Sequence, residues 1–309
     1  MKKQNSNLHK AKKAKDDEFY TQLGDIEFQM KNFKKDFKDK IIFLNCDDPE
    51  WSNFWKYFSL NFDYLGLKKL ISTHYSEGNQ SYKMEMVKMK DNQPEYIKTD
   101  LKGDGDFRSE ESIELLKEAD FVITNPPFSL FREYVAQLIE YNKKFLIIGN
   151  HNAITYKEIY TLIKENKIWL SYRFNKGNAY FKTTKTVNDF KKGVFDEKTG
   201  LVKMRNVSWF SNLETKQRNE EFLLFREYNE QDYDKYDNFN AIEVGTLNDI
   251  PKDYEGVMGV PITFLQNYNP KQFRIIGFRK GDNGKDLCVN GKDKYFRILI
   301  QKINKKGSK

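Results

Sequence analysis

Short apolar runs alternate with segments of helical periodicity through the first half of this chain. The runs at 41–45, 121–124 and 145–148 have the length of one buried strand, and the segments 109–119 and 130–141 have the length of an ordinary helix. Strands that alternate with helices in this way are typical of βαβ units. Because such units bury their sheet under helices on both faces, the pattern predicts an α/β fold with a mostly parallel sheet.

The alternation ends before both chain ends are reached, and this predicts the domain organisation. Residues 1–18 are rich in lysine and are expected to form a flexible basic arm. A helical pattern begins at Phe19, so the α/β domain is expected to span 19–175. Beyond residue 176 the strands become isolated between segments rich in Gly, Asn, Asp and Lys, which indicates a second, less regular region over 176–309.

The net charge of +8 is concentrated at the two ends of the chain. Residues 1–15 contain six lysines and no acid, and residues 271–309 contain twelve basic and three acidic residues, so the middle of the chain is acidic overall. Segregated basic segments fit a polyanionic partner. Solvated tails that keep the protein in solution are an equally good interpretation of the charge alone.

The sequence also argues against several classes of protein. Its apolar runs are far too short to cross a bilayer, and no apolar stretch follows the N-terminal lysines as it would in a signal peptide. The two cysteines, Cys46 and Cys288, are far apart and have no metal-ligand spacing. We therefore expect a reduced, cytoplasmic protein with no metal site and no membrane contact.

The apolar run at 121–124 is followed at once by Asn125-Pro126-Pro127-Phe128. Open α/β sheets bind ligands beyond the carboxyl ends of their strands, where this tetrapeptide is expected to lie. Proline fixes φ and lacks an N–H group, so the Pro126 carbonyl is held in one direction, and the side-chain oxygen of Asn125 is a second, neutral acceptor. Phe128 adds a flat apolar face. A simple strand-ending turn is the alternative interpretation.

Two fixed acceptors beside an aromatic ring suit one kind of chemistry. An exocyclic amino group has two N–H donors and would satisfy both acceptors while the heterocycle that carries it stacks on Phe128. Hydrogen bonds that draw the amino group out of conjugation leave its lone pair available as a nucleophile. The motif therefore predicts alkylation of an amino group on a planar heterocycle, with Asn125, Pro126 and Phe128 as catalytic residues.

The tetrapeptide Asn125-Pro126-Pro127-Phe128 resembles the catalytic motif of S-adenosylmethionine-dependent amino-methyltransferases. More of the chain resembles one branch of them, the EcoRI-type adenine-specific DNA methyltransferases, from about residue 8 to 300 with a weaker stretch near 174–235. The stretches that carry this resemblance are LHKAKKAKDDEFYTQ, NCDDPEWSNFWKYF, GDGDFRSEESIELLK, VITNPPFSLFREY, ITYKEIYTLIKENKIWL and GVMGVPITFL. The resemblance implies a Rossmann-like, S-adenosylmethionine-binding sheet and a C-terminal target-recognition region.

The resemblance also implies roles for individual residues. Asn125 and the Pro126 carbonyl would hold the N6 amino group of adenine, and Phe128 would stack on the base after it has left the duplex. Much of the catalysis would be positioning, so neither a metal nor a dedicated general base is expected. Asp106 and Phe107, in KGDGDF, resemble the pair that receives the cofactor's adenine, although a glycine turn would explain the same residues.

The remaining cofactor contacts follow from the same resemblance. DEFYTQ resembles the segment that lies against the methionine end of the cofactor, which an ordinary helix start would equally explain. The usual glycine-rich loop after the first strand is missing, and NCDDPEWSNF, which a capped loop before a helix would also explain, stands in its place. The residues expected at the methionine end are Tyr20, Thr21, Asp47, Asp48 and Pro49, and Asn125 is expected to contact the cofactor as well.

Charge and resemblance together predict the partners. Four lysines directly before the cofactor-side segment would bind the phosphate backbone of duplex DNA, and these are Lys10, Lys12, Lys13 and Lys15. The predicted function is a site-specific DNA adenine-N6 methyltransferase of a restriction–modification system, with a cognate restriction endonuclease that acts separately. An RNA base methyltransferase, a protein-glutamine methyltransferase and a non-catalytic nucleic-acid-binding protein are the alternatives.

Overall fold

The computed structural model describes residues 19–303 apart from 77, 89–93, 175–177 and 184–186. Its contacts divide the chain into two compact units. The first takes in the chain up to Ile163 together with Ile168–Leu213, and the second consists of Lys164–Lys167 and the chain from Glu214 onward. In the described part of the chain, no helix is long and apolar enough to span a membrane.

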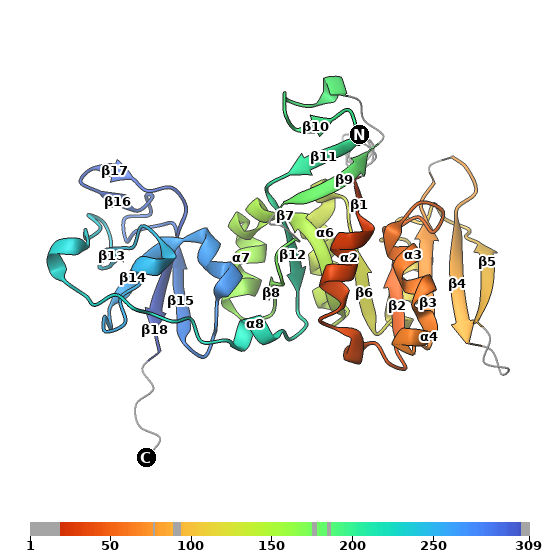
Figure 1. The fold of residues 1–309 in the computed structure, drawn as a ribbon, viewed down its shortest axis with the longest axis horizontal. Coiled ribbons are helices and arrows are strands. Elements are labelled where there is room, and N and C mark those ends of the chain that lie inside the picture. Colours follow the sequence, from red (N-terminus) through yellow and green to blue (C-terminus); the bar gives the residue numbers. More distant parts are fainter. Residues whose placement is uncertain (1–18, 77, 89–93, 175–177, 184–186, 304–309) are drawn as a thin grey trace, which may run out of the picture. The chain divides into compact units, whose positions relative to one another are not determined.

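An eight-stranded sheet forms the centre of the first unit, in the order β5-β4-β3-β2-β6-β7-β12-β8 (Figure 1). Its four central strands are parallel: β3 (Lys69–His74), β2 (Ile41–Leu44), β6 (Phe121–Thr124) and β7 (Lys144–Asn150). The outer strands are antiparallel to their neighbours: β4 (Tyr82–Lys88), β5 (Pro94–Asp100), β12 (Val207–Ser211) and β8 (Trp169–Leu170).

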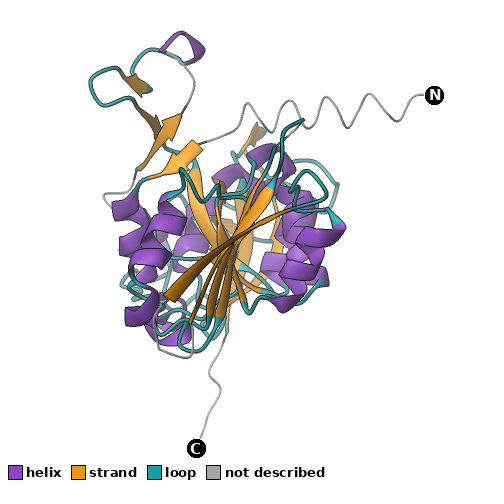
Figure 2. Cartoon of the chain, turned by 90° about the vertical axis from the view of Figure 1, so that its right-hand side faces the viewer, coloured by secondary structure: helices purple, strands orange, loops and turns teal. Residues whose placement is uncertain are grey.

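The sheet is therefore mixed, and the expectation of a mostly parallel sheet is correct only for its centre. Strand β4 is one that the pattern of apolar runs does not predict. The connection from β3 to β4 is too short for the crossover that a parallel neighbour needs. Strand β4 can therefore pair with β3 only in the antiparallel direction. Helices lie on both sides of the sheet, as the sequence predicts (Figure 2).

Two of these helices begin at serine caps. The Ser52 hydroxyl accepts a hydrogen bond from the Phe54 N–H at 3.0 Å at the start of α3 (Asn53–Leu60). The Ser109 hydroxyl accepts one from the Ser112 N–H at 3.2 Å at the start of α5 (Glu110–Glu118). Each cap satisfies a backbone donor that the first turn leaves unpaired. The other helices of this unit are α2 (Leu23–Met30), α4 (Phe62–Leu65), α6 (Phe131–Glu140) and α7 (Lys157–Lys164), whose last residue the contacts assign to the second unit.

Aromatic side chains hold the helices on the sheet. The ring of Phe37 packs edge-on against Phe58 and Phe121, with ring centroids 5.7 and 5.5 Å apart, and all three rings are buried. Gly149, near the end of β7, lies directly under the ring of Phe131, and a Cβ added at that glycine would collide with it. Because Phe131 begins α6, this glycine lets the helix that follows the NPPF segment approach the sheet closely.

A smaller antiparallel sheet in the first unit includes the first described residues. It has the order β1 (Phe19–Thr21), β9 (Ala179–Thr183), β11 (Leu201–Met204) and β10 (Phe195–Asp196). The helix expected from Phe19 is therefore wrong at its start. Residues 19–21 pair with β9, Gln22 is extended (φ −72°, ψ 141°), and helix α2 begins only at Leu23.

The second unit is built on a four-stranded sheet, β13-β14-β18-β15. These strands are β13 (Ile242–Glu243), β14 (Val257–Pro261), β18 (Arg297–Lys302) and β15 (Phe273–Phe278), and they are accompanied by α8 (Lys216–Asn219) and the pair β16 (Cys288–Val289) and β17 (Lys292–Asp293). The sequence predicts a boundary at 175/176, whereas the contacts assign Ile168–Leu213 to the first unit. The reason is that β12 completes the large sheet, while β9 and β11 pair with each other beside β1.

Candidate active site

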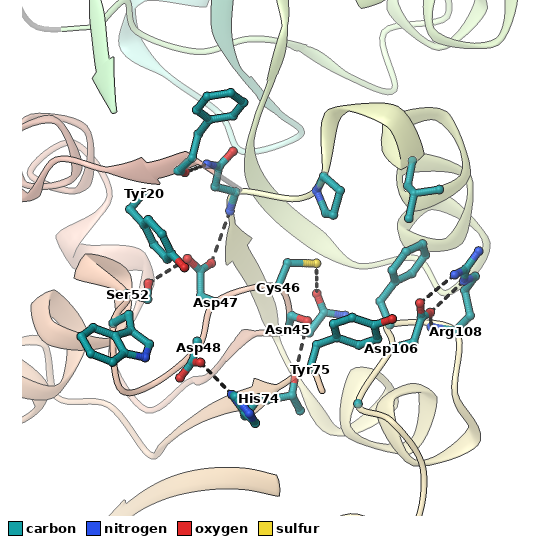
Figure 3. Close-up of a pocket in the computed structure, with 18 residues that line it drawn as sticks. Tyr20, Asn45, Cys46, Asp47, Asp48, Ser52, His74, Tyr75, Asp106 and Arg108 are labelled. Atoms are coloured by element: carbon teal, nitrogen blue, oxygen red, sulfur yellow. Dashed lines mark hydrogen bonds and ion pairs between the residues drawn. The ribbon is translucent and has the colours of Figure 1, made fainter. Parts of the chain in front are cut away.

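A pocket of about 290 Å³ lies at the carboxyl ends of β2, β3 and β6 (Figure 3). Strand β3 pairs with one side of β2 and β6 pairs with the other, so the order of the strands reverses at β2. Open α/β sheets bind ligands at such switch points, and small-molecule sites have volumes of roughly 300–1,000 Å³. Six of the residues predicted to form the site line this pocket: Tyr20, Asp47, Asp48, Asp106, Phe107 and Asn125.

The other predicted residues do not line it. Thr21, Pro49 and Pro126 are buried beside it, and half-buried Phe128 begins the 3-10 turn η2 (Phe128–Leu130). The Phe128 ring stacks against the ring of Phe19, with centroids 6.2 Å apart and planes inclined by 26°. The predicted DNA-binding lysines lie outside the described residues, and these are Lys10, Lys12, Lys13 and Lys15.

Asn125 is oriented by the backbone of β1. Its Nδ2 donates a hydrogen bond to the Phe19 carbonyl oxygen at 2.5 Å, and its backbone N–H donates to Oδ2 of Asp47 at 3.3 Å. Its Oδ1 is buried and accepts no hydrogen bond from the described residues. A buried acceptor left without a donor costs about 1–3 kcal/mol, so an N–H group that reaches this oxygen would be stabilised.

The two proline carbonyls differ in how they are used. The Pro127 carbonyl accepts a hydrogen bond from the Leu130 N–H at 3.0 Å, inside the η2 turn. That hydrogen bond belongs to the turn that leads directly into α6, so the Pro127 carbonyl already has a backbone donor. The Pro126 carbonyl precedes the turn and is the one that the sequence predicts as the second acceptor.

Asp47 connects the ends of two strands and the start of a helix. Its Oδ1 accepts a hydrogen bond from the Ser52 hydroxyl, the cap of α3, at 2.7 Å. Its Oδ2 accepts from the Thr124 hydroxyl and from the Asn125 N–H, at the end of β6. Burial raises the pKa of Asp47 to about 6, although these hydrogen bonds lower it in part. The geometry therefore makes Asp47 a support for the backbone of Asn125.

This raised pKa predicts how stability depends on pH. Because the pKa of Asp47 is about 6 in the folded chain and 3.8 in the unfolded reference, the folded state binds the proton more tightly. The stabilisation is complete below about pH 4 and is lost as the pH rises through about 6, which amounts to about 3 kcal/mol. Urea unfolding of wild type and Asp47→Asn from about pH 4 to 7 should show wild type losing stability relative to the variant. Parallel curves would contradict this assignment.

Asp48 faces the end of β3. Its Oδ2 lies 2.7 Å from Nδ1 of His74, and its Oδ1 accepts the Glu50 N–H at 2.8 Å. The His74 ring stacks on Tyr82, with centroids 4.7 Å apart. His74 and its neighbour Tyr75 both line the pocket, and the sequence analysis did not single them out. Their position at the carboxyl end of β3 is the signal that could have found them, because ligands of open α/β sheets bind there.

Asp106 and Phe107 form the opposite wall. The Nε and Nη2 atoms of Arg108, which the sequence analysis missed, each donate to a different oxygen of Asp106 at 2.7 Å. The ring of Phe107 packs edge-on against Tyr134 of α6, with centroids 5.0 Å apart. The Tyr134 hydroxyl donates in turn to Oδ1 of Asn45, another residue of the pocket lining. This wall is therefore held from two neighbouring elements.

Cys46 also lines the pocket, next to Asp47. Burial, with the negative charges of Asp47 and Asp106, raises the pKa of its thiol well above the ordinary range. The side chain is thus a neutral thiol near pH 7 and a poor nucleophile. Within the described ranges, no group of three or more His, Cys, Asp or Glu side chains is arranged to hold a metal ion.

An acceptor that lacks a donor among the described residues lies at a pocket lined by carboxylates, above the switch point of an α/β sheet. This arrangement suits the class of protein that binds a ligand through an amino group.

Comparison with known proteins specifies the class further. The family model described as adenine-specific methyltransferase EcoRI matches residues 7–306. The type II methyltransferase M.EcoRI of Escherichia coli is 50% identical over 314 residues, which cover 96% of each chain. M.MgeORF184P of Mycoplasma genitalium is 40% identical (96% of this chain, 98% of that one), and M.MpnI of Mycoplasma pneumoniae is 36% identical (95% and 97%).

This chain belongs to the EcoRI-type adenine-specific methyltransferase family, which confirms the resemblance seen in its sequence. No solved structure matches the chain significantly.

Proposed function

We propose that this protein is a site-specific DNA adenine-N6 methyltransferase, which transfers a methyl group from S-adenosylmethionine to an adenine flipped out of duplex DNA. The observation that carries the proposal is the buried Oδ1 of Asn125, an acceptor with no donor among the described residues. The family supports adenine as the target. The names of the relatives, all type II methyltransferases, support a role in restriction–modification.

The pocket suits the proposed cofactor by its charge. S-adenosylmethionine supplies an electrophilic methyl group and carries positive charge on its sulfur and on its amino group. The carboxylates of Asp47, Asp48 and Asp106 line the pocket, but Asp106 is paired with Arg108, so Asp47 and Asp48 would supply the attraction for a cationic ligand. Asp106 and Phe107 would hold the adenine end, the methionine end would be held by Tyr20, Thr21, Asp47, Asp48 and Pro49, and Asn125 would also contact the cofactor. The order of the parallel strands, β3-β2-β6-β7, supports a Rossmann-like assignment of the sheet.

The chain's own part in the reaction is to hold an amino group. The N6 amino group would donate one hydrogen bond to Oδ1 of Asn125 and one to the Pro126 carbonyl, which would leave its lone pair free to act as a nucleophile. Phe128 would stack on the adenine. The bound cofactor would supply the methyl group, its sulfur would keep the electron pair of the broken bond, and the N6 proton would pass to water. Catalysis by orientation needs no metal and no dedicated general base.

The DNA must be bound and the base extruded for this geometry to form. The basic arm is proposed to bind the phosphate backbone through Lys10, Lys12, Lys13 and Lys15, and the region 176–309 is proposed to recognise the target sequence. A restriction endonuclease that cuts the same unmodified site would act separately. An enzyme that modifies the cell's own DNA acts where that DNA lies, so the cytoplasm is the proposed compartment.

Labelled S-adenosylmethionine tests the proposal directly. The protein is incubated in turn with duplex DNA, ribosomal RNA and a release-factor protein, and each product is digested to identify the labelled residue. We expect N6-methyladenine from DNA and no label in the other two. Label confined to RNA or to glutamine would overturn the proposal, and no label in any substrate would indicate a non-catalytic protein.

A further inference from the structure

The small antiparallel sheet of the first unit has one face of mixed tyrosine and lysine. Tyr20 of β1 lies opposite Lys182 of β9, and Tyr180 of β9 lies opposite Lys203 of β11. Residues directly opposite each other across two strands share a face, and residues two apart along one strand share it as well. These four side chains therefore lie on the same face, and we call Tyr180, Lys182 and Lys203 the tyrosine–lysine strip.

The opposite face of this sheet belongs to the core. Ala179, Phe181 and Val202 are almost completely buried, and Phe19 packs against the same core. The pleat thus leaves the strip on the outer side, where Tyr180 is 37% exposed and Lys182 is also exposed. Figure 2 shows this sheet extending away from the helices that cover the large sheet.

The tyrosine–lysine strip lies next to the pocket. Tyr20, which shares its face, lines the pocket, and the carbonyl of its neighbour Phe19 holds the side chain of Asn125. Neighbouring strands are about 4.8 Å apart, so Lys182 is one strand and Lys203 two strands away from the residue that lines the pocket. A base extruded into such a site brings its own and its neighbouring phosphates to the rim.

No acidic side chain among the described residues neutralises the charge of the two lysines. Neither forms an ion pair with a described residue, whereas Lys69 in the large sheet contacts both Glu85 and Glu118. The ammonium of Lys203 lies 6.0 Å from the centroid of the Tyr180 ring. At that distance the ammonium can still contact an anion. The described residues of 179–205 include six basic and three acidic side chains, so the surroundings are also positive.

We propose that the tyrosine–lysine strip binds the phosphate backbone of duplex DNA beside the extruded adenine. This inference rests on the proposed function and deepens it, because it assigns a DNA contact to the catalytic unit itself. Lysine side chains supply point charges to phosphate oxygens, and a tyrosine hydroxyl can donate to them as well. Such contacts fix the register of the duplex over the pocket and carry no sequence information.

The salt dependence of DNA binding tests the strip. Each neutralised phosphate contributes about 0.9 to the slope of log affinity against log salt. The double variant Lys182→Ala/Lys203→Ala should therefore have a slope about 1.8 smaller than wild type. Its affinity deficit should shrink about tenfold between about 50 and 200 mM salt, measured by fluorescence anisotropy with labelled duplex DNA.

Two matched variants make the result specific. Lys35→Ala/Lys38→Ala removes the same amount of charge from two exposed lysines just before β2. They lie at the amino end of this strand, opposite the pocket, so the salt slope of DNA binding should be unchanged. Lys182→Arg/Lys203→Arg keeps the charge and should retain the wild-type slope. Binding of S-adenosylmethionine, followed by calorimetry, should be equal in all of them, which shows that the pocket is intact.

The outcomes separate the two proposals. Suppose that wild type methylates duplex DNA but Lys182→Ala/Lys203→Ala keeps the wild-type salt slope. That result would overturn the proposed role of the tyrosine–lysine strip and would leave the proposed function standing. Wild type that methylates no DNA would overturn the proposed function. A reduced slope with RNA but not with duplex DNA would overturn the assignment of the strip to DNA.

Discussion

Replacing Asn125 by alanine is expected to lower kcat for methyl transfer by about 10²–10³-fold or more, while affinity for duplex DNA should stay close to that of wild type. The side chain supplies one of the two acceptors that orient the N6 amino group, and loss of one preorganised hydrogen-bonding group at a reacting centre commonly has an effect of this size. Single-turnover methylation gives the rate, and anisotropy with labelled DNA gives the affinity.

The variant Asn125→Asp separates the two functions of this side chain. It retains an acceptor of the same size but loses the Nδ2 donor that now contacts the Phe19 carbonyl. We expect activity between that of wild type and that of the alanine variant, because the acceptor is present but less firmly held. Equal loss of DNA binding and turnover in Asn125→Ala would contradict a catalytic role and indicate a structural one.

Replacing Phe128 by alanine is expected to lower kcat/KM on duplex DNA by about 5- to 150-fold. Stacking of a base on an aromatic ring contributes about 1–3 kcal/mol, and Phe128 follows the two predicted acceptors of the NPPF segment directly in the chain. A duplex with 2-aminopurine at the target position should fluoresce more strongly with the variant than with wild type, since the extruded base then lacks a ring that quenches it.

Phe128→Leu is the matched control, because it fills much of the space beside Phe19 but offers no flat face. The Phe128 and Phe19 rings are stacked, so the alanine variant also loses packing. Activity in Phe128→Leu should stay close to that of the alanine variant, whereas Phe128→Tyr should approach wild type. Wild-type activity in the leucine variant would mean that packing, not stacking on the base, explains the effect.

Local rules explain why much of the fold follows from the sequence. The segments 41–44 and 121–124 are strands because they are almost entirely apolar and are buried on both faces. Helices α3 and α5 begin where a serine can cap the first turn. By contrast, residues 19–21 have a helical pattern and form a strand, because pairing with β9 outweighs a local preference. No local signal reveals that partner.

The candidate site shows the same division. The NPPF segment is found from residue type and position, since it follows a strand at its carboxyl end, whereas Asp47 and Asp48 are expected only from the family resemblance. His74 and Arg108 carry no recognisable motif, and each becomes part of the pocket lining through a contact with one of its acids. Such contacts depend on how the strands are ordered, which a periodic pattern does not specify.

The sequence by itself determined the family and the buried strands, and it predicts the two acceptors with their aromatic neighbour, because these depend on residue chemistry and on short-range spacing. Only the tertiary structure decided that β1 lies beside β9, and this pairing has two consequences. It places the Phe19 carbonyl where it orients Asn125, and it aligns Tyr20, Lys182 and Lys203 on one outer face. Strand pairing is a long-range choice made by the packing of the whole unit, so no short stretch of sequence contains it.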